Sequence, residues 1–153
     1  VNDAYFGKVP ADRLKMDKTV AFFKADAAYR SKIGVSPTRA TNWVGSYDAA
    51  TKTLTLVTYD FNPADHQYVN SAWEIQKDPF SGDVLNAYND GPMKPGQPQM
   101  GHFYELESSS PAASLAPGAK QRHRHTTFHV QGPDSLLNQL AERLLHTNLN
   151  GLK

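Results

Sequence analysis

Cysteine is absent from the 153 residues of this chain, which excludes disulfide bonds and thiolate metal ligands. No apolar run reaches the roughly eighteen residues that a membrane-spanning helix needs, so no membrane partner is expected. The sequence as given also shows no secretory signal peptide. Many periplasmic proteins lack cysteine too, and we favour a periplasmic or secreted location.

A charge excess of either sign is also missing. Sixteen basic residues balance fifteen acidic ones, and the formal net charge is +1. Such a chain has no strong positive field with which to attract nucleic acid nonspecifically, so no nucleic-acid partner is expected. The sequence has no glycine-rich phosphate loop and no Gly-x-Ser-x-Gly nucleophile elbow.

What is present fits one domain with its own core. Hydrophobic residues make up 39% of the chain and charged residues 20%, which excludes a fully disordered chain. We therefore expect residues 1–153 to form a single β-sandwich-like domain. The chain begins at Val1 without a methionine, so we also expect that the true N-terminus has been cut off.

Short runs of β-branched and aromatic residues alternate with turn signals, as in antiparallel sandwiches. The clearest hairpin covers residues 42–61, with its turn at Asp48-Ala49-Ala50-Thr51. A second pair is expected between residues 68–76 and 83–90, joined by Asp-Pro-Phe-Ser-Gly. Residues 102–108, HFYELES, predict a further strand.

Helical periodicity is strong only near the C-terminus. Leu136, Leu137, Leu140 and Leu144 follow the spacing of one helix face. Asp134 or Ser135 can cap the start of this helix, and Gly151 is a plausible stop. The predicted fold class is mainly β, an antiparallel sandwich with one C-terminal helix that packs on a sheet.

Three of the six histidines fall in one strand-like segment, QRHRHTTFHVQ, at His123, His125 and His129. Alternate residues of a strand share a face, and imidazoles two positions apart lie about 7 Å from each other. The three histidines are thus a candidate site for a divalent metal such as zinc, manganese or iron, with Glu105 or Glu107 as a further ligand. A polar ligand-binding face and a purely structural polar strand are the alternatives.

A second candidate group consists of carboxylates, amides and aromatic rings. Glu105 and Glu107 share a face of their strand, and two carboxylates so close can split their pKa values. The plainer alternative is that both only meet solvent or arginines. Sugar sites combine flat apolar surfaces with amides and carboxylates that bind hydroxyl groups. The candidate substrate-binding residues are Asn70, Trp73, Asn86, Tyr88 and Glu105.

Three segments of the chain resemble a known family. They are AYFGKVPADRL, YVNSAWEIQKDPFSGDVLNAYNDGP and FYELESSSPAASLAPGAKQRHRHTTFHVQG. Together they resemble the C-terminal part of an uncharacterised bacterial family placed with the galactose-mutarotase-like β-supersandwich proteins. The resemblance covers nearly the whole chain and implies a β-supersandwich fold.

The resemblance also implies a role for one glutamate. Aldose epimerases of the wider superfamily carry a Leu-Glu-Thr-type element before a Pro-Gly turn and a last strand, an order that Leu106-Glu107-Ser108 and Pro117-Gly118 resemble. Glu107 is then the base that takes the anomeric proton. No upstream motif matches the acid histidine of those enzymes. We expect His123 or His125 to share a solvent-reachable pocket with Glu105 or Glu107.

The leading prediction is therefore a carbohydrate-binding protein or an aldose 1-epimerase-like isomerase, with a carbohydrate ligand as its partner. No cofactor is expected unless the histidines hold a divalent metal. One alternative is a cupin-like metalloenzyme that uses His123, His125 and His129; Gly118 precedes them at a suitable spacing, but the carboxylate of that motif is absent. The other alternative is a noncatalytic structural part of a larger protein, completed by an N-terminal portion of the same protein.

Overall fold

The computed structural model describes residues 1, 3, 6–17, 19–70, 72, 74–94 and 96–152. Over this part of the chain, the strands are β1 (Leu14–Asp17), β2 (Val20–Phe23), β3 (Ser31–Val35), β4 (Trp43–Asp48), β5 (Thr53–Tyr59), β6 (Leu85–Asn89), β7 (Tyr104–Ser108) and β8 (His125–Gln131), followed by the helix α1 (Asp134–Leu145). Among these described residues, no helix has the length and apolar character needed to cross a membrane.

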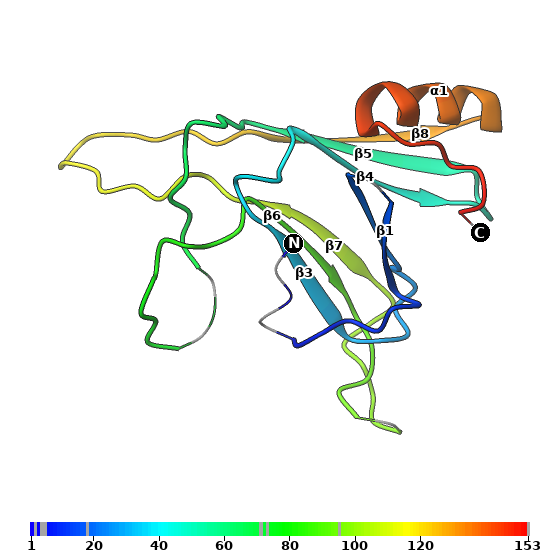
Figure 1. Ribbon diagram of the computed structural model, residues 1–153, viewed down its shortest axis with the longest axis horizontal. Helices are drawn as coiled ribbons and strands as arrows, with labels where there is room; N and C mark the ends of the chain where they lie inside the picture. The colour runs from blue at the N-terminus through cyan, green and yellow to red at the C-terminus, as the bar shows by residue number, and fades with distance from the viewer. Residues whose placement is uncertain are drawn as a thin grey trace.

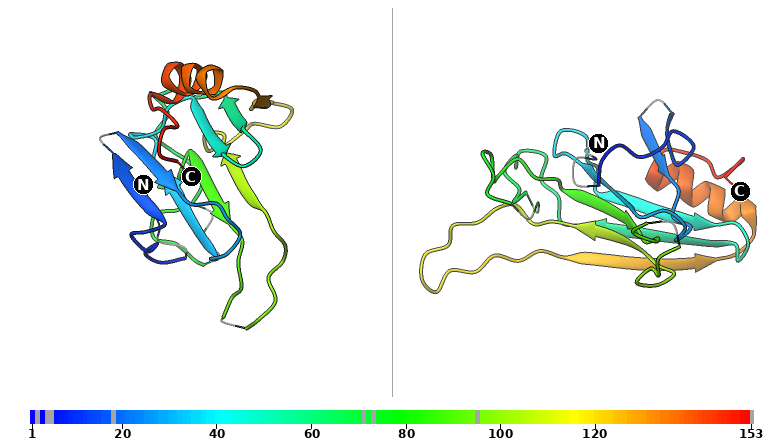
Figure 2. Two further views of the ribbon diagram at one scale, coloured as in Figure 1. Left: turned by 90° about the vertical axis from the view of Figure 1, so that its right-hand side faces the viewer. Right: turned by 90° about the horizontal axis from the view of Figure 1, so that it is seen from below.

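The strands form three antiparallel sheets, in the orders β1-β2, β3-β6-β7 and β4-β5-β8. Figure 1 shows α1 above the β4-β5-β8 sheet and the β3-β6-β7 sheet below it. The predicted fold class, a mainly β sandwich-like chain with a C-terminal helix, is confirmed. A long two-armed excursion, residues 109–124, connects β7 of one sheet to β8 of the other and extends away from both (Figures 1 and 2).

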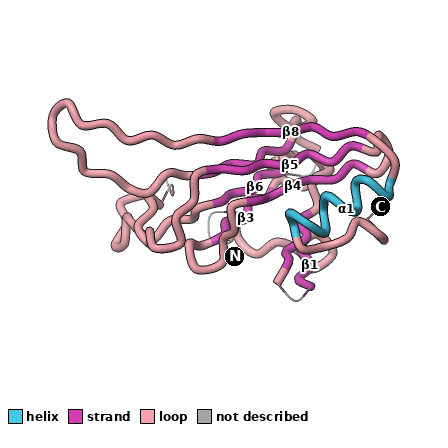
Figure 3. The backbone as a smooth tube through the Cα atoms, turned by 90° about the horizontal axis from the view of Figure 1, so that it is seen from above, coloured by secondary structure: helices cyan, strands magenta, loops and turns pink. Residues whose placement is uncertain are grey.

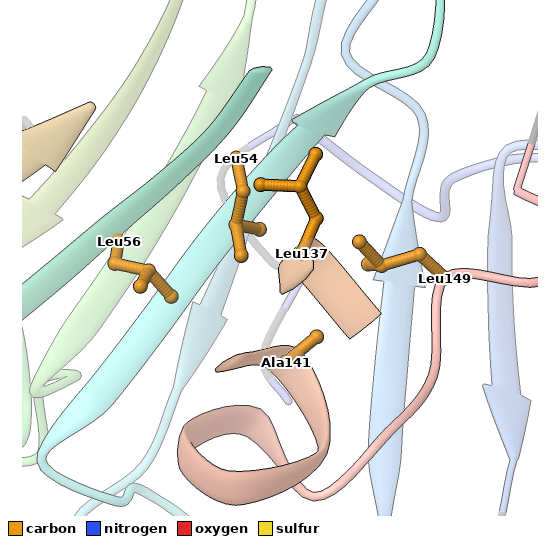
Figure 4. Close-up of a cluster of buried hydrophobic side chains, with 5 residues drawn as sticks. All are labelled: Leu54, Leu56, Leu137, Ala141 and Leu149. Atoms are coloured by element: carbon orange, nitrogen blue, oxygen red, sulfur yellow. The ribbon is translucent and has the colours of Figure 1, made fainter. Parts of the chain in front are cut away.

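The helix covers one face of the β4-β5-β8 sheet, as Figure 3 shows. Leu54 and Leu56 of β5 lie two residues apart, so both point toward α1, where they meet Leu137 and Ala141. Figure 4 shows these side chains as members of one buried cluster with Leu149, and Leu137 and Ala141 are fully buried. The predicted packing of the leucine stripe on a sheet is correct, although Leu136 is 43% exposed.

The predicted ends of the helix are partly wrong. Asp134 is the first helical residue, and Pro133 occupies the cap position without a side-chain hydrogen bond. The helix ends at Leu145, well before Gly151, because His146 adopts a left-handed conformation with φ of 55°. This C-cap conformation terminates the helix, and its N–H still bonds the Ala141 carbonyl.

A second buried cluster joins the two three-stranded sheets. Tyr59 of β5 and Leu85 of β6 point toward each other's sheet and pack with Tyr68 and Val84. Val35 and Val44 lie at its border. The inner faces of the two sheets are thereby defined, and every second residue of β3, β6 and β7 must point to the opposite, outer side.

The hairpin predicted over residues 42–61 is confirmed by the register Trp43↔Thr58 to Asp48↔Thr53. The second predicted pair is wrong, because β6 pairs with β3 and β7 instead. Of the described residues between 68 and 76, Tyr68 alone makes a bridge, an isolated one to Ser81. Here side chains satisfy the backbone locally, since the Gln76 amide donates to the carbonyls of Asn70 and Ala72.

Candidate functional site

The strongest candidate site lies on the face of the β3-β6-β7 sheet that is turned away from β4-β5-β8, called here the outer face. The strand register places Lys32, Tyr88 and Glu105 side by side in one row. Gly34, Asn86 and Glu107 form the next row. Both sets of residues that the sequence grouped by alternation, Glu105 with Glu107 and Asn86 with Tyr88, therefore meet on one surface.

The centre of the outer face is an ion pair between β3 and β7. The Lys32 ammonium donates to both Glu107 carboxylate oxygens, at 2.9 and 3.0 Å. The two side chains are partly shielded, with 21% and 35% of their surface exposed. Contact through both oxygens fixes the direction of the carboxylate, which a single hydrogen bond would leave free to turn.

Glu105 lies beside this pair on the same face of β7. Burial raises the pKa of Glu105 above its ordinary value of 4.5, and the neighbouring Glu107 carboxylate raises it further. The Lys32 charge acts in the opposite direction but does not cancel the rise. The outer face thus holds two adjacent carboxyl groups with different environments, which is the arrangement used for paired acid and base roles.

A further carboxylate lies over the second row. A Cβ atom placed on Gly34 would fall 1.9 Å from an Asp83 carboxylate oxygen, so the missing side chain leaves room for Asp83. Together with the amide of Asn86, these groups give the face several hydrogen-bond acceptors and donors in a small area. Such a surface suits a ligand with several hydroxyl groups.

Tyr88 lies in the first row of the outer face, where neighbouring rings cover it. It is only 6% exposed, and its ring lies between those of Phe6 and Phe103. Its hydroxyl donates to Asp90 at 2.7 Å and accepts from Arg30 Nε at 3.3 Å. Tyr88 was predicted to bind substrate, and its buried ring offers little area on which a ligand could stack.

Asp90 is fully buried at the end of this row. Burial favours the neutral acid, but hydrogen bonds from Tyr88, Gly101 and Gly91 and the charge of Arg30 together lower the pKa of Asp90 below its ordinary value. Asp90 is therefore a carboxylate at neutral pH. It is held in place by its donors and fixes the loop between β6 and β7 against the sheet.

A cavity of about 190 Å³ opens where that loop returns to the sheet. Its polar wall is formed by Arg30, Asp90 and Gln99, and its apolar wall by Met93, Pro98 and Met100. Arg30 and Asp90 belong to the row next to Lys32 and Tyr88, because they continue the same strands by two residues. The cavity thus lies at one end of the outer face.

The histidines lie elsewhere, on the inner side. The Ser108 hydroxyl is 2.9 Å from His123 Nε2 and 2.9 Å from His125 Nδ1. Ser108 follows Glu107 directly in β7, so the two side chains point to opposite faces of the sheet. The expectation that Glu107 shares a pocket with His123 or His125 is therefore corrected, because Ser108 and not Glu107 is on the face of β7 that meets the histidines.

The three histidines are not gathered around one point either. His129 Nδ1 is paired with the Thr55 hydroxyl of β5 at 3.0 Å, while His123 and His125 share Ser108. Among the residues that the structure describes, no three histidine, aspartate or glutamate side chains are grouped so that they could hold a metal ion. The geometry therefore gives no support to the three-histidine metal site or to the cupin-like alternative.

Of the other predicted substrate-binding residues, Asn70 does not join the outer face. The Asn70 side chain accepts from the Ala72 N–H within its own loop, and Trp73 lies outside the described residues. Sequence reasoning missed Lys32 and Arg30. The alternation of Ser31-Lys32-Ile33-Gly34-Val35 could have predicted a strand there, but nothing local to it indicated that β6 would be its neighbour.

Comparison with protein families finds one match. A model described as a family of unknown function, DUF6786, covers residues 1–153. No curated protein and no solved structure matches the chain.

Proposed function

Because the chain belongs to the DUF6786 family, whose function is unknown, we propose from the site itself that the outer face binds a carbohydrate and catalyses aldose 1-epimerase-like proton transfer. One observation carries the proposal. Both carboxylate oxygens of Glu107 accept hydrogen bonds from Lys32, while the adjacent Glu105 has a pKa above its ordinary value, chiefly because of burial. One group is suited to accept a proton and its neighbour to donate one.

The reaction fits two neighbouring carboxyl groups. In the ring-opening step, Glu107 takes the proton of the anomeric hydroxyl while Glu105 gives its proton to the ring oxygen. The bond between the anomeric carbon and the ring oxygen breaks as the carbonyl forms. Both oxygens are attached to the same carbon, so the two carboxyl groups need only reach adjacent atoms.

Ring closure on the other face of the carbonyl returns both protons. The Glu105 carboxylate now accepts the proton of the ring hydroxyl, and protonated Glu107 donates to the carbonyl oxygen. The two groups exchange roles and end in their starting states, so the cycle needs no further reagent. The resemblance to galactose-mutarotase-like proteins supports the same assignment of Glu107 as the base, whereas the acid is here Glu105 in place of a histidine.

The test is a comparison of mutarotation rates by polarimetry over a panel of aldoses. Glu107→Gln keeps the shape of the side chain but removes the proton acceptor, and we expect at least a roughly hundredfold loss of rate. Glu142→Gln on the exposed side of α1 is the matched control and should leave the rate unchanged. Circular dichroism confirms that both variants are folded.

The pH dependence gives a second readout. Because Glu105 must carry its proton, activity should fall as the pH rises through its raised pKa, and Glu105→Gln should lose activity even below that pH. Activity that survives in both the Glu105 and the Glu107 variants would remove the catalytic role from this face. An absence of sugar binding in the whole panel would leave the face without a ligand-binding function.

A further inference from the structure

The cavity at the end of the outer face is too small for a whole ligand. Ligand pockets usually enclose about 300–1,000 Å³, whereas this cavity holds about 190 Å³. At roughly 30 Å³ for each water-sized group, it holds about six such groups. It therefore has the size of a pocket for one substituent of a ligand whose remaining part lies on the outer face.

Arg30 supplies hydrogen-bond donors to this cavity. Its Nε donates to Tyr88, but among the described residues no acceptor is recorded for its two terminal nitrogens. Neither terminal nitrogen is buried without a partner. Solvent or a ligand can therefore reach both. Phe6, whose ring lies 4.7 Å from the guanidinium, keeps Arg30 in place.

Gln99 supplies the complementary acceptor. Its Nε2 donates to the carbonyls of Ala27 and Gly101, at 2.9 and 2.7 Å, which settles the orientation of the amide. Its Oε1 has no recorded donor within the described part of the chain and is not a buried unpartnered atom. The cavity thus offers donors from Arg30 and one acceptor from Gln99.

The remaining wall of the cavity is apolar, and its methionine side chains are flexible. Met93 and Met100 are each 71% exposed at the rim, and Pro98 lies beside them. Thioether side chains adapt their shape to a small apolar group such as a methyl. A donor, an acceptor and an apolar wall together match the three parts of an acetamido group: its carbonyl oxygen, its N–H and its methyl.

We propose that this cavity is an acetamido subsite and that the carbohydrate bound on the outer face is a 2-acetamido sugar. This inference rests on the function proposed above. The carbonyl oxygen accepts from Arg30, the N–H donates to Gln99 Oε1, and the methyl group contacts Met93 and Met100. A sugar carboxylate is the main competitor for Arg30. It fits less well, because the guanidinium already faces the charge of Asp90 and the surrounding face carries further carboxylates.

The experiment uses the whole chain and matched monosaccharides of gluco, galacto and manno configuration. Each configuration is tested as the 2-acetamido sugar, the parent sugar and the uronate. Ligand-observed NMR by saturation transfer gives the dissociation constants and identifies the ligand protons in contact with the protein. We expect at least one acetamido sugar to bind about tenfold more tightly than its parent, with the strongest saturation at the acetyl methyl.

Two cavity-filling variants test the position of the subsite. Met93→Trp and Met100→Trp each enlarge a side chain that lines the cavity without removing a hydrogen bond, and each should abolish the tenfold preference. Met16→Trp is the control, since Met16 is 60% exposed on β1 and does not line the cavity. A preference that survives both cavity variants overturns the inference.

The remaining outcomes separate this inference from the function on which it rests. Parent sugars that bind through Glu107, with no gain from the acetamido group, overturn the subsite and leave the proposed function standing. A preference for uronates does the same and assigns Arg30 to a carboxylate. A panel in which no sugar binds overturns both proposals.

Discussion

At the scale of single residues, the outer face shows how neighbours give two identical side chains different chemistry. Glu107 is paired with the Lys32 ammonium. The pKa of Glu105, in contrast, is raised by burial and by the neighbouring Glu107 carboxylate. The difference does not come from the strand, which presents both carboxyl groups in the same way. It comes from β3, which places its lysine within reach of one glutamate's oxygens.

The raised pKa of Glu105 predicts a pH-dependent effect on stability. A carboxyl whose pKa is higher in the folded state than its ordinary 4.5 binds its proton more tightly on folding. The resulting stabilisation is present below pH 4.5 and is lost as the pH rises through the folded-state pKa. Glu105→Gln should therefore raise the melting temperature at pH 7 and give no gain at pH 4.

Glu142→Gln serves as the control in these melting experiments, because Glu142 is exposed on α1 far along the chain from the pair. Thermal unfolding followed by circular dichroism at several pH values gives the comparison. A lower melting temperature of Glu105→Gln at pH 7 would show that the Glu105 carboxylate is stabilised by the fold, contrary to the assigned direction.

At the scale of elements, β7 and α1 differ in how many of their faces make contacts. The strand β7 uses both of its faces, whereas α1 buries only one. The strand β7 directs Glu105 and Glu107 outward and Tyr104, Leu106 and Ser108 inward, so one strand serves both the candidate site and the contact between sheets. The helix buries only one stripe. Leu137 and Ala141 are fully covered by the sheet, while the adjacent Leu136 remains 43% exposed.

This difference predicts the cost of removing each leucine. Leu137→Ala leaves a cavity between α1 and β5 and should lower the free energy of unfolding by about 2–5 kcal/mol. Leu136→Ala, the neighbouring control on the same helix, should change it by no more than about 0.5–1 kcal/mol. Urea unfolding followed by circular dichroism measures both, and equal losses would contradict the packing of α1 through Leu137.

At the scale of the whole molecule, two buried clusters hold three layers together. One joins α1 to β4-β5-β8 through Leu54 and Leu137, and the other joins this sheet to β3-β6-β7 through Tyr59 and Val84. The strand β5 contributes to both clusters, one from each face. Because the two clusters share a strand, loss of either one should weaken the other.

A single cooperative unit is the expected consequence, as the sequence suggested for residues 1–153. Val84→Ala, at a fully buried position, should cost about 2 kcal/mol. Both Val84→Ala and Leu137→Ala should then shift one common transition, seen at the same urea concentration by circular dichroism and by tryptophan fluorescence. Two separate transitions, each moved by only one of the variants, would show that the layers unfold independently.

The sequence by itself determined which side chains share a face of a strand or helix. The alternation of residues 102–108, of 83–90 and of the histidine segment, and the spacing of the C-terminal leucines, follow from backbone geometry within one element. For this reason the grouping of Glu105 with Glu107, the confirmed hairpin of residues 42–61 and the packing of the helix on a sheet could all be predicted.

Only the tertiary structure decided which elements lie next to one another. It turned the Ser108 face of β7 toward His123 and His125, which left Glu107 on the opposite face, and it brought Lys32 to Glu107 across 75 positions of sequence. It also gave β6 two partners that are distant in sequence and left most of the described residues 68–76 without strand pairing. Pairing depends on which of several compatible strands buries the most apolar surface and satisfies the most backbone groups, and that competition is settled by the whole chain at once.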